Sequence, residues 1–89
     1  MTRWITVEDH PNYEVSNNGE VRNKRTGRIL KGMVNPINGY LRVTLDGEKE
    51  YIHRLVGQAF FAGYGPRRRI KHLDDGKLKN STTNLSFMG

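Results

Sequence analysis

The chain has 89 residues, with fifteen Lys and Arg against nine Asp and Glu and a net charge of +6 at neutral pH. This length predicts a single domain with a small core and excludes a two-domain enzyme. Cysteine is absent, which excludes disulfides, thiolate nucleophiles and zinc sites built on sulfur. A mean hydropathy of −0.74 and the charges that interrupt every apolar run predict a cytoplasmic protein without a membrane segment. The excess of positive charge favours nucleic acid as the partner.

The predicted elements are short strands joined by turns, with one helix. Asn18-Gly19 and Asp46-Gly47 predict two tight hairpin turns between segments of strand character. Leu55, Val56, Ala59 and Phe60 recur at helical spacing and predict a helix over 54–61. Strands are expected at residues 13–15, 20–23, 28–31, 40–45, 49–52, 70–73 and 85–88. The last two are expected to pair, so the fold class is α+β with small antiparallel hairpins and one main helix.

The histidines and aromatic residues have mostly structural interpretations. His53 stands at a strand-to-helix junction and is expected to be a packed or capping residue, whereas His10 is expected on the surface. Tyr51 and Tyr64 are either core residues or exposed rings that stack on a base. The remaining large rings are expected in the core, because a small domain needs them for burial: Trp4, Tyr13, Tyr40, Phe60, Phe61 and Phe87.

Basic residues gather in two parts of the sequence. The first group surrounds one predicted hairpin and comprises Arg22, Lys24, Arg25, Arg28 and Lys31. The second comprises Arg67, Arg68, Arg69 and Lys71, with Lys77 further on. We expect both groups to contact phosphates, although the arginine run is also compatible with a solvated turn. They form one positive surface if they face the same way. Because a recognition helix rich in Arg, Asn and Gln is lacking, any base specificity would come from the strands.

Several motifs resemble segments of phage and intron HNH homing endonucleases. The segments that resemble the NUMOD4 motif of that family are Trp4-Ile5, Tyr13 to Asn17 and Gly19 to Arg22. The segments that resemble the strand and helix before its HNH motif are Gly39 to Val43, His53 to Val56 and Ala59-Phe60. The first half of the HNH motif is resembled by His72, Asp74, Asn80 and Asn84-Leu85. The resemblance divides the chain into a NUMOD4-like segment at 1–35 and a partial HNH-like segment at 36–89, which ends in a truncated ββα-metal hairpin.

The resemblance implies roles for the residues of this hairpin. His72 would be the general base that activates water, and Asn84 would orient its ring. Magnesium or manganese would assist the reaction, as divalent cations do in phosphodiester hydrolysis. Asn80 is expected to hold the loop.

Two departures from the family pattern bear on catalysis. Lys71 stands where the family typically has Asp or Asn as a metal ligand, and an ammonium group has no lone pair to donate. The helix that carries the family's last metal ligand is not expected, because the sequence ends at Gly89. Asp74 or Asp75 is the alternative oxygen ligand.

Three hypotheses remain open. The favoured one is an HNH-derived domain that binds phosphate-bearing ligands, with DNA first, and no longer cleaves or needs a cofactor. The second is an active nicking endonuclease that uses His72 and magnesium or manganese, with a homodimer as a way to supply the missing helix. The third is a phage protein that holds a nucleotide or a host protein at the altered site and so counters a bacterial defence. Lys71 opposes the second hypothesis and favours the others, because beside His72 it would help to make an anion pocket.

Overall fold

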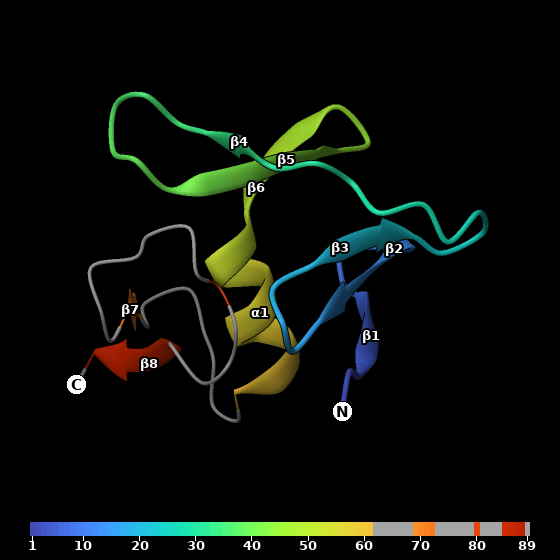
Figure 1. The fold of residues 1–89 in the computed structure, drawn as a ribbon, viewed down its shortest axis with the longest axis horizontal. Helices are drawn as coiled ribbons and strands as arrows, with labels where there is room; N and C mark the ends of the chain where they lie inside the picture. Colours follow the sequence, from blue (N-terminus) through green and yellow to red (C-terminus); the bar gives the residue numbers. More distant parts are fainter. Residues whose placement is uncertain (62–68, 73–79, 81–84, 89) are drawn as a thin grey trace.

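The computed structural model describes residues 1–61, 69–72, 80 and 85–88. In these residues, one helix lies among two three-stranded antiparallel sheets and one two-stranded antiparallel sheet (Figure 1). The described part of the chain has no helix with the length and apolar character needed to cross a bilayer. The three antiparallel sheets and the helix confirm the predicted α+β fold with small hairpins and one main helix.

The first sheet contains β1 (Trp4–Val7), β2 (His10–Ser16) and β3 (Val21–Asn23). Val15 pairs with Ile5 on one side and with Val21 on the other. The predicted hairpin around Asn18-Gly19 is confirmed, but β2 begins three residues earlier than expected and β1 had not been predicted as a strand.

The second sheet contains β4 (Met33–Val34), β5 (Leu41–Leu45) and β6 (Glu48–Tyr51). Asp46 and Gly47 have φ values of 52° and 82°, which confirms the predicted tight turn and fits the type I′ geometry that Asp-Gly favours.

The strand predicted over 28–31 is wrong. Ile29 makes only an isolated bridge with Arg22, and the next strand is β4. At this point the chain passes from the first sheet to the second. Gly32 lies so close to Leu41 that a Cβ atom at position 32 would collide with the Leu41 side chain. Local strand propensity is overridden because the segment has to cross between two sheets.

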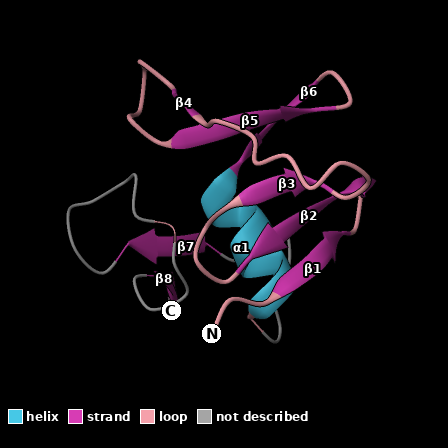
Figure 2. Ribbon diagram, turned by 45° about the vertical axis from the view of Figure 1, so that its right-hand side comes forward, coloured by secondary structure: helices cyan, strands magenta, loops and turns pink. Residues whose placement is uncertain are grey.

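Helix α1 (Ile52–Phe60) begins two residues before the predicted start. Its buried side chains Ile52, Leu55 and Val56 meet those of both larger sheets. The core contributed by the sheets consists of Val7, Val15, Val21, Val43 and Leu45. Figure 2 shows α1 between β1-β2-β3 and the hairpin of β7 (Arg69–His72) and β8 (Leu85–Met88). Burial of each large apolar side chain contributes roughly 1.5–3 kcal/mol, so this junction is the main source of stability.

His10 links the two larger sheets, and its predicted surface position is wrong. The residue is 2% exposed. Its Nδ1 lies 2.9 Å from Asp46 Oδ2 in the β5–β6 turn, and its Nε2 lies 2.9 Å from Glu50 Oε2 on β6. A neutral imidazole can donate to only one carboxylate, so two carboxylates at these distances favour the doubly protonated ring. The hydrogen bond to Asp46, together with Glu50 and Glu48, raises the pKa of His10 although burial opposes the charge.

Candidate nucleic-acid interface

Arg22, predicted to contact phosphate, is engaged within the protein. It stands opposite Glu14 in the β2–β3 pair, and its Nε donates to Glu14 Oε1 at 3.0 Å. Its guanidinium also lies 4.0 Å from the centroid of the Trp4 ring, where a cation and an aromatic face attract each other. These contacts give Arg22 a structural role, and its contact with phosphate stays a prediction.

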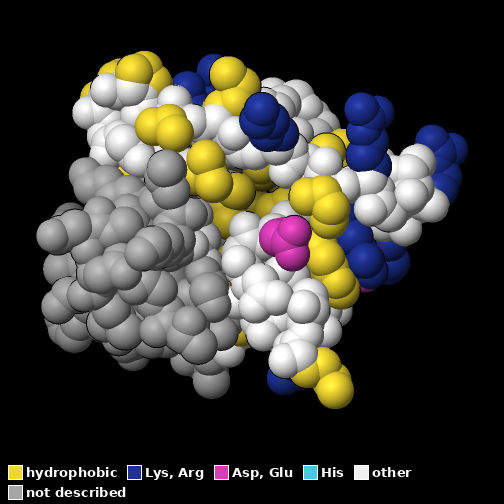
Figure 3. All heavy atoms as spheres, in the orientation of Figure 1, with side chains coloured by type: hydrophobic (Ala, Val, Ile, Leu, Met, Phe, Trp, Pro, Cys, Tyr) yellow, Lys and Arg dark blue, Asp and Glu magenta, His cyan; other side chains and the backbone are white. Residues whose placement is uncertain are grey.

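The turn that follows β3 presents three further basic residues of the first group. Lys24, Arg25 and Arg28 are all exposed. The turn is held by Asn23, whose Oδ1 accepts the backbone N–H groups of Arg25 and Thr26. In the space-filling view, basic side chains project from the right-hand end of the molecule and along the upper edge over β4-β5-β6 (Figure 3). This turn is therefore a projecting cationic corner.

A second cationic surface lies on β4-β5-β6, and the sequence reasoning missed two of its residues. Arg42 pairs with Tyr51, and Thr44 pairs with Lys49. Directly opposed residues share a face, so these side chains point away from the core-facing Val43. The alternation of apolar and polar residues along 41–45 was the signal that could have revealed Arg42 as an outward residue.

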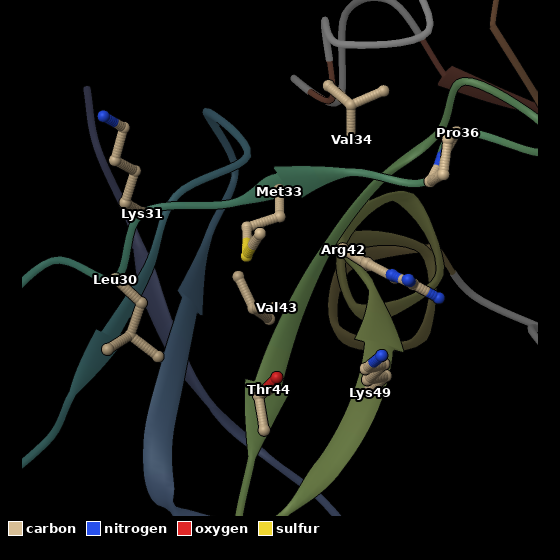
Figure 4. A pocket seen from close by; sticks show the side chains of 9 residues that line it. All are labelled: Leu30, Lys31, Met33, Val34, Pro36, Arg42, Val43, Thr44 and Lys49. Atoms are coloured by element: carbon tan, nitrogen blue, oxygen red, sulfur yellow. The ribbon is translucent and has the colours of Figure 1, made fainter.

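The cationic side chains border a groove, which we call the sheet groove. It has a volume of about 340 Å³. Figure 4 shows Met33 and Val43 in the middle of the lining, with Lys31 on one side of them and Arg42 and Lys49 on the other. Within the described residues, no carboxylate forms an ion pair with any of these three cations. The remaining lining residues are Leu30, Val34, Pro36 and Thr44.

Tyr51 fixes the end of β6 that leads into the helix. Its hydroxyl oxygen accepts the side-chain N–H groups of Asn35 and Asn38, each at 2.8 Å. These donors, with Asn38 contributing most, lower the pKa of Tyr51 because they stabilise the phenolate. His53 is buried, with its ring centroid 4.9 Å from that of Tyr40 and 5.5 Å from that of Tyr51. The packed role expected for His53 is confirmed, whereas stacking of Tyr51 on a base stays a prediction.

The β7–β8 hairpin confirms the predicted pairing of the last two strands. His72 stands opposite Leu85, and Lys71 stands opposite Ser86. Asn84, the predicted orienter of His72, lies outside the described residues. The same holds for the candidates Asp74, Asp75, Tyr64, Arg67, Arg68 and Lys77. The roles of His72, Arg69 and Lys71 stay predictions.

Of the second predicted basic group, Arg69 and Lys71 lie on the described strand β7, which is apart from the turn after β3. In both ribbon views β7 and the turn after β3 lie on opposite sides of α1 (Figures 1 and 2). The sheet groove, which the sequence had not indicated, lies on the second sheet, β4-β5-β6, above them in Figure 1.

The described residues do not fit a divalent-cation site. Among them, no group of three His, Asp or Glu side chains could hold a metal ion. Lys71, which precedes His72 in β7, is a residue type that cannot ligate a cation in its ammonium form. We therefore derive no step through a metal ion.

The sequence and the α+β fold are similar to those of HNH endonucleases. The sequence matches the NUMOD4 motif over residues 3–46. The chain is a NUMOD4-containing relative of the HNH endonucleases, as its resemblance had implied.

Three comparisons specify this kinship. DNA endonuclease I-HmuI of Bacillus phage SP01 is 37% identical over 90 residues, which are 96% of this chain and 51% of that protein. An uncharacterised HNH endonuclease of Acanthamoeba polyphaga mimivirus is 32% identical over 91 residues, 98% of this chain and 27% of that protein. The solved structure of the HNH homing endonuclease I-HmuI, described for DNA binding and cleavage, superposes with a TM-score of 0.82 at 33% identity over 97% of this chain and 52% of that chain. The chain thus spans about half of the length of I-HmuI and about a quarter of the mimivirus protein.

Proposed function

We propose that this chain is an HNH-endonuclease-derived domain that binds DNA and has lost cleavage. The observation that carries the proposal is the sheet groove, which Lys31, Arg42 and Lys49 border without a carboxylate partner among the described residues. Kinship supports the choice of ligand, because the solved structure of I-HmuI concerns DNA binding and cleavage.

The groove suits a nucleic-acid backbone for electrostatic reasons. Lysine and arginine gain affinity for phosphate by releasing the counterions condensed on the duplex. Lys31 and Lys49 are exposed, whereas Arg42 is half-buried and held in register by its strand. The major groove of DNA admits a two-stranded β-ribbon, and β5 with β6 forms such a ribbon with Arg42, Thr44 and Lys49 on one face.

The proposed loss of cleavage depends on Lys71. A nuclease of this kind needs a cation beside the general base to stabilise the leaving oxygen. A lysine next to His72 repels that cation and supplies no oxygen ligand. The same ammonium group attracts phosphate, so the position favours binding over hydrolysis.

A supercoiled plasmid incubated with the protein and magnesium tests both parts of the proposal in one gel. We expect a band shift without nicking for the wild type. In Lys49→Gln the affinity should fall by about fivefold, which corresponds to the roughly 1 kcal/mol of one hydrogen-bonded contact. Arg3→Gln removes the same charge from an exposed residue outside the groove and should bind more nearly as the wild type does. An equal loss in both variants would show that net charge, and not the groove, determines binding.

The nicking readout decides between the proposal and an active enzyme. Metal-dependent nicking that disappears in His72→Ala would establish a nuclease and contradict the proposed loss. Lys71→Asp restores an oxygen ligand, and a gain of nicking in this variant alone would support the account given for Lys71. If the wild type produces neither a shift nor a nick, DNA is the wrong ligand and a nucleotide or a host protein takes its place.

A further inference from the structure

The turn between β2 and β3 is fixed from within. The buried Ser16 accepts the backbone N–H groups of Asn18 and Glu20 through its Oγ, at 3.2 and 3.1 Å. The N–H of Gly19 donates to the Ser16 carbonyl oxygen at 3.0 Å. Because Ser16 is fully buried, this turn cannot shift without disturbing the first sheet.

Gly19 at the tip of this turn lies against Asn80. A Cβ atom at position 19 would stand 2.8 Å from the carbonyl carbon and oxygen of Asn80 and 2.9 Å from its Cβ. Side-chain carbons essentially never approach other atoms this closely. Asn80 itself is 3% exposed, so the contact is part of the protein interior.

We propose that Gly19 is a positioning residue against which Asn80 packs. Through this contact the first sheet, β1-β2-β3, determines the placement of the β7–β8 hairpin. Asn80 lies between the two strands of that hairpin in the sequence, eight residues after His72 and five before Leu85. A side chain at position 19 has to displace Asn80, because the turn is held by Ser16. Any effect of this placement on DNA binding rests on the proposed function, whereas the contact between Gly19 and Asn80 does not.

The chain offers matched controls for this inference. Gly27 and Gly47 also have positive φ values, 72° and 82°, but a Cβ atom at either would meet nothing within 4 Å. Alanine at position 19, 27 or 47 therefore brings comparable backbone strain, and only position 19 adds the clash. Gly19→Asn and Gly47→Asn form a second pair, because asparagine tolerates the left-handed conformation. This pair remains informative if Gly19→Ala fails to fold.

Nuclear magnetic resonance of the labelled full chain is the test. We expect the Gly19 variants to shift the amide resonances of Asn80, Lys71, His72 and Leu85. The Gly27 and Gly47 variants should leave these resonances unchanged. Hairpin resonances that respond equally in Gly19→Asn and Gly47→Asn would overturn the inference. A DNA gel shift on the same samples is read separately: absent binding by the wild type would contradict the proposed function and leave the positional result intact.

Discussion

At the scale of single residues, the partners of a side chain decide what it can do. Arg22 and Arg42 both lie on strands and carry the same guanidinium. The guanidinium of Arg22 contacts Glu14 and Trp4, whereas Arg42 lines the sheet groove. An arginine already paired with a carboxylate offers less to a phosphate, because that ion pair has to be weakened first. The exposed groove residues are therefore stronger candidates for contact with DNA than Arg22.

His10 makes the stability of the protein depend on pH. Its pKa is raised above the ordinary value of 6.5 by Asp46 and Glu50, so folding binds a proton. The stabilisation is fully present below pH 6.5 and is lost as the pH rises through the raised folded-state pKa. We expect the free energy of unfolding, measured with urea across this range, to decrease with rising pH.

The substitution Asp46→Asn removes the carboxylate charge at position 46 and keeps the geometry of the turn. Asn-Gly forms the same type of turn as Asp-Gly, but it removes the carboxylate that contributes most to the pKa of His10. The decrease in stability with pH should therefore become smaller and be complete at a lower pH. Glu20→Gln changes the same charge at an exposed site and should retain the wild-type profile. A pH profile that Asp46→Asn leaves unaltered would show that His10 is not its source.

At the scale of elements, β5 serves the core and the candidate interface at once. Val43 and Leu45 face the junction with α1, while Arg42 and Thr44 face the sheet groove. Because successive side chains of a strand point to opposite faces, packing on one face fixes the cations on the other. Burial of β5 thus orders the proposed binding surface.

Leu45→Ala tests this dependence. Leu45 is 0% exposed, and removal of a fully buried leucine side chain costs about 2–5 kcal/mol. For a small domain this is a large part of the total stability, so we expect urea unfolding at a much lower concentration. Ile37→Ala removes an equally large side chain that is 92% exposed, and it should change stability by less than about 0.5 kcal/mol. Equal effects of the two substitutions would contradict the described core.

At the scale of the whole molecule, charge and size set the mode of binding. The described chain measures 36 Å along its longest axis, close to one turn of B-DNA at about 34 Å. The net charge of +6 attracts a duplex from any side, but only contacts made in the complex release counterions. The dependence of binding on salt therefore counts the cations in use.

The expected slope follows from the sheet groove. Each phosphate contact contributes about −0.9 to the slope of log K against log salt, so Lys31, Arg42 and Lys49 together give about −2.7. Fluorescence anisotropy with a labelled duplex measures this slope, and Lys49→Gln should reduce its magnitude by about 1. A steeper wild-type slope would indicate that the exposed residues of the turn after β3 also contact DNA. A slope near zero would point to a small-ligand pocket.

The sequence by itself determined the features that depend on neighbouring residues. Asp46-Gly47 predicted its turn, the spacing of Leu55 and Val56 predicted the helix, and the closing apolar segment predicted the β7–β8 pair. The motifs around the first hairpin and His72 also indicated the family correctly. These features are readable because backbone geometry and side-chain periodicity are local.

Only the tertiary structure decided which distant residues meet. It buried His10 between carboxylates of the second sheet and brought Arg22 into contact with Glu14 and Trp4. The segment 28–31, expected to be a strand, instead crosses between the two sheets. The tertiary structure also placed Lys31, Arg42 and Lys49 around one groove, and packed Asn80 against Gly19. Each outcome depends on which surfaces pack against each other, and a pattern along one segment carries no information about the segment that covers it.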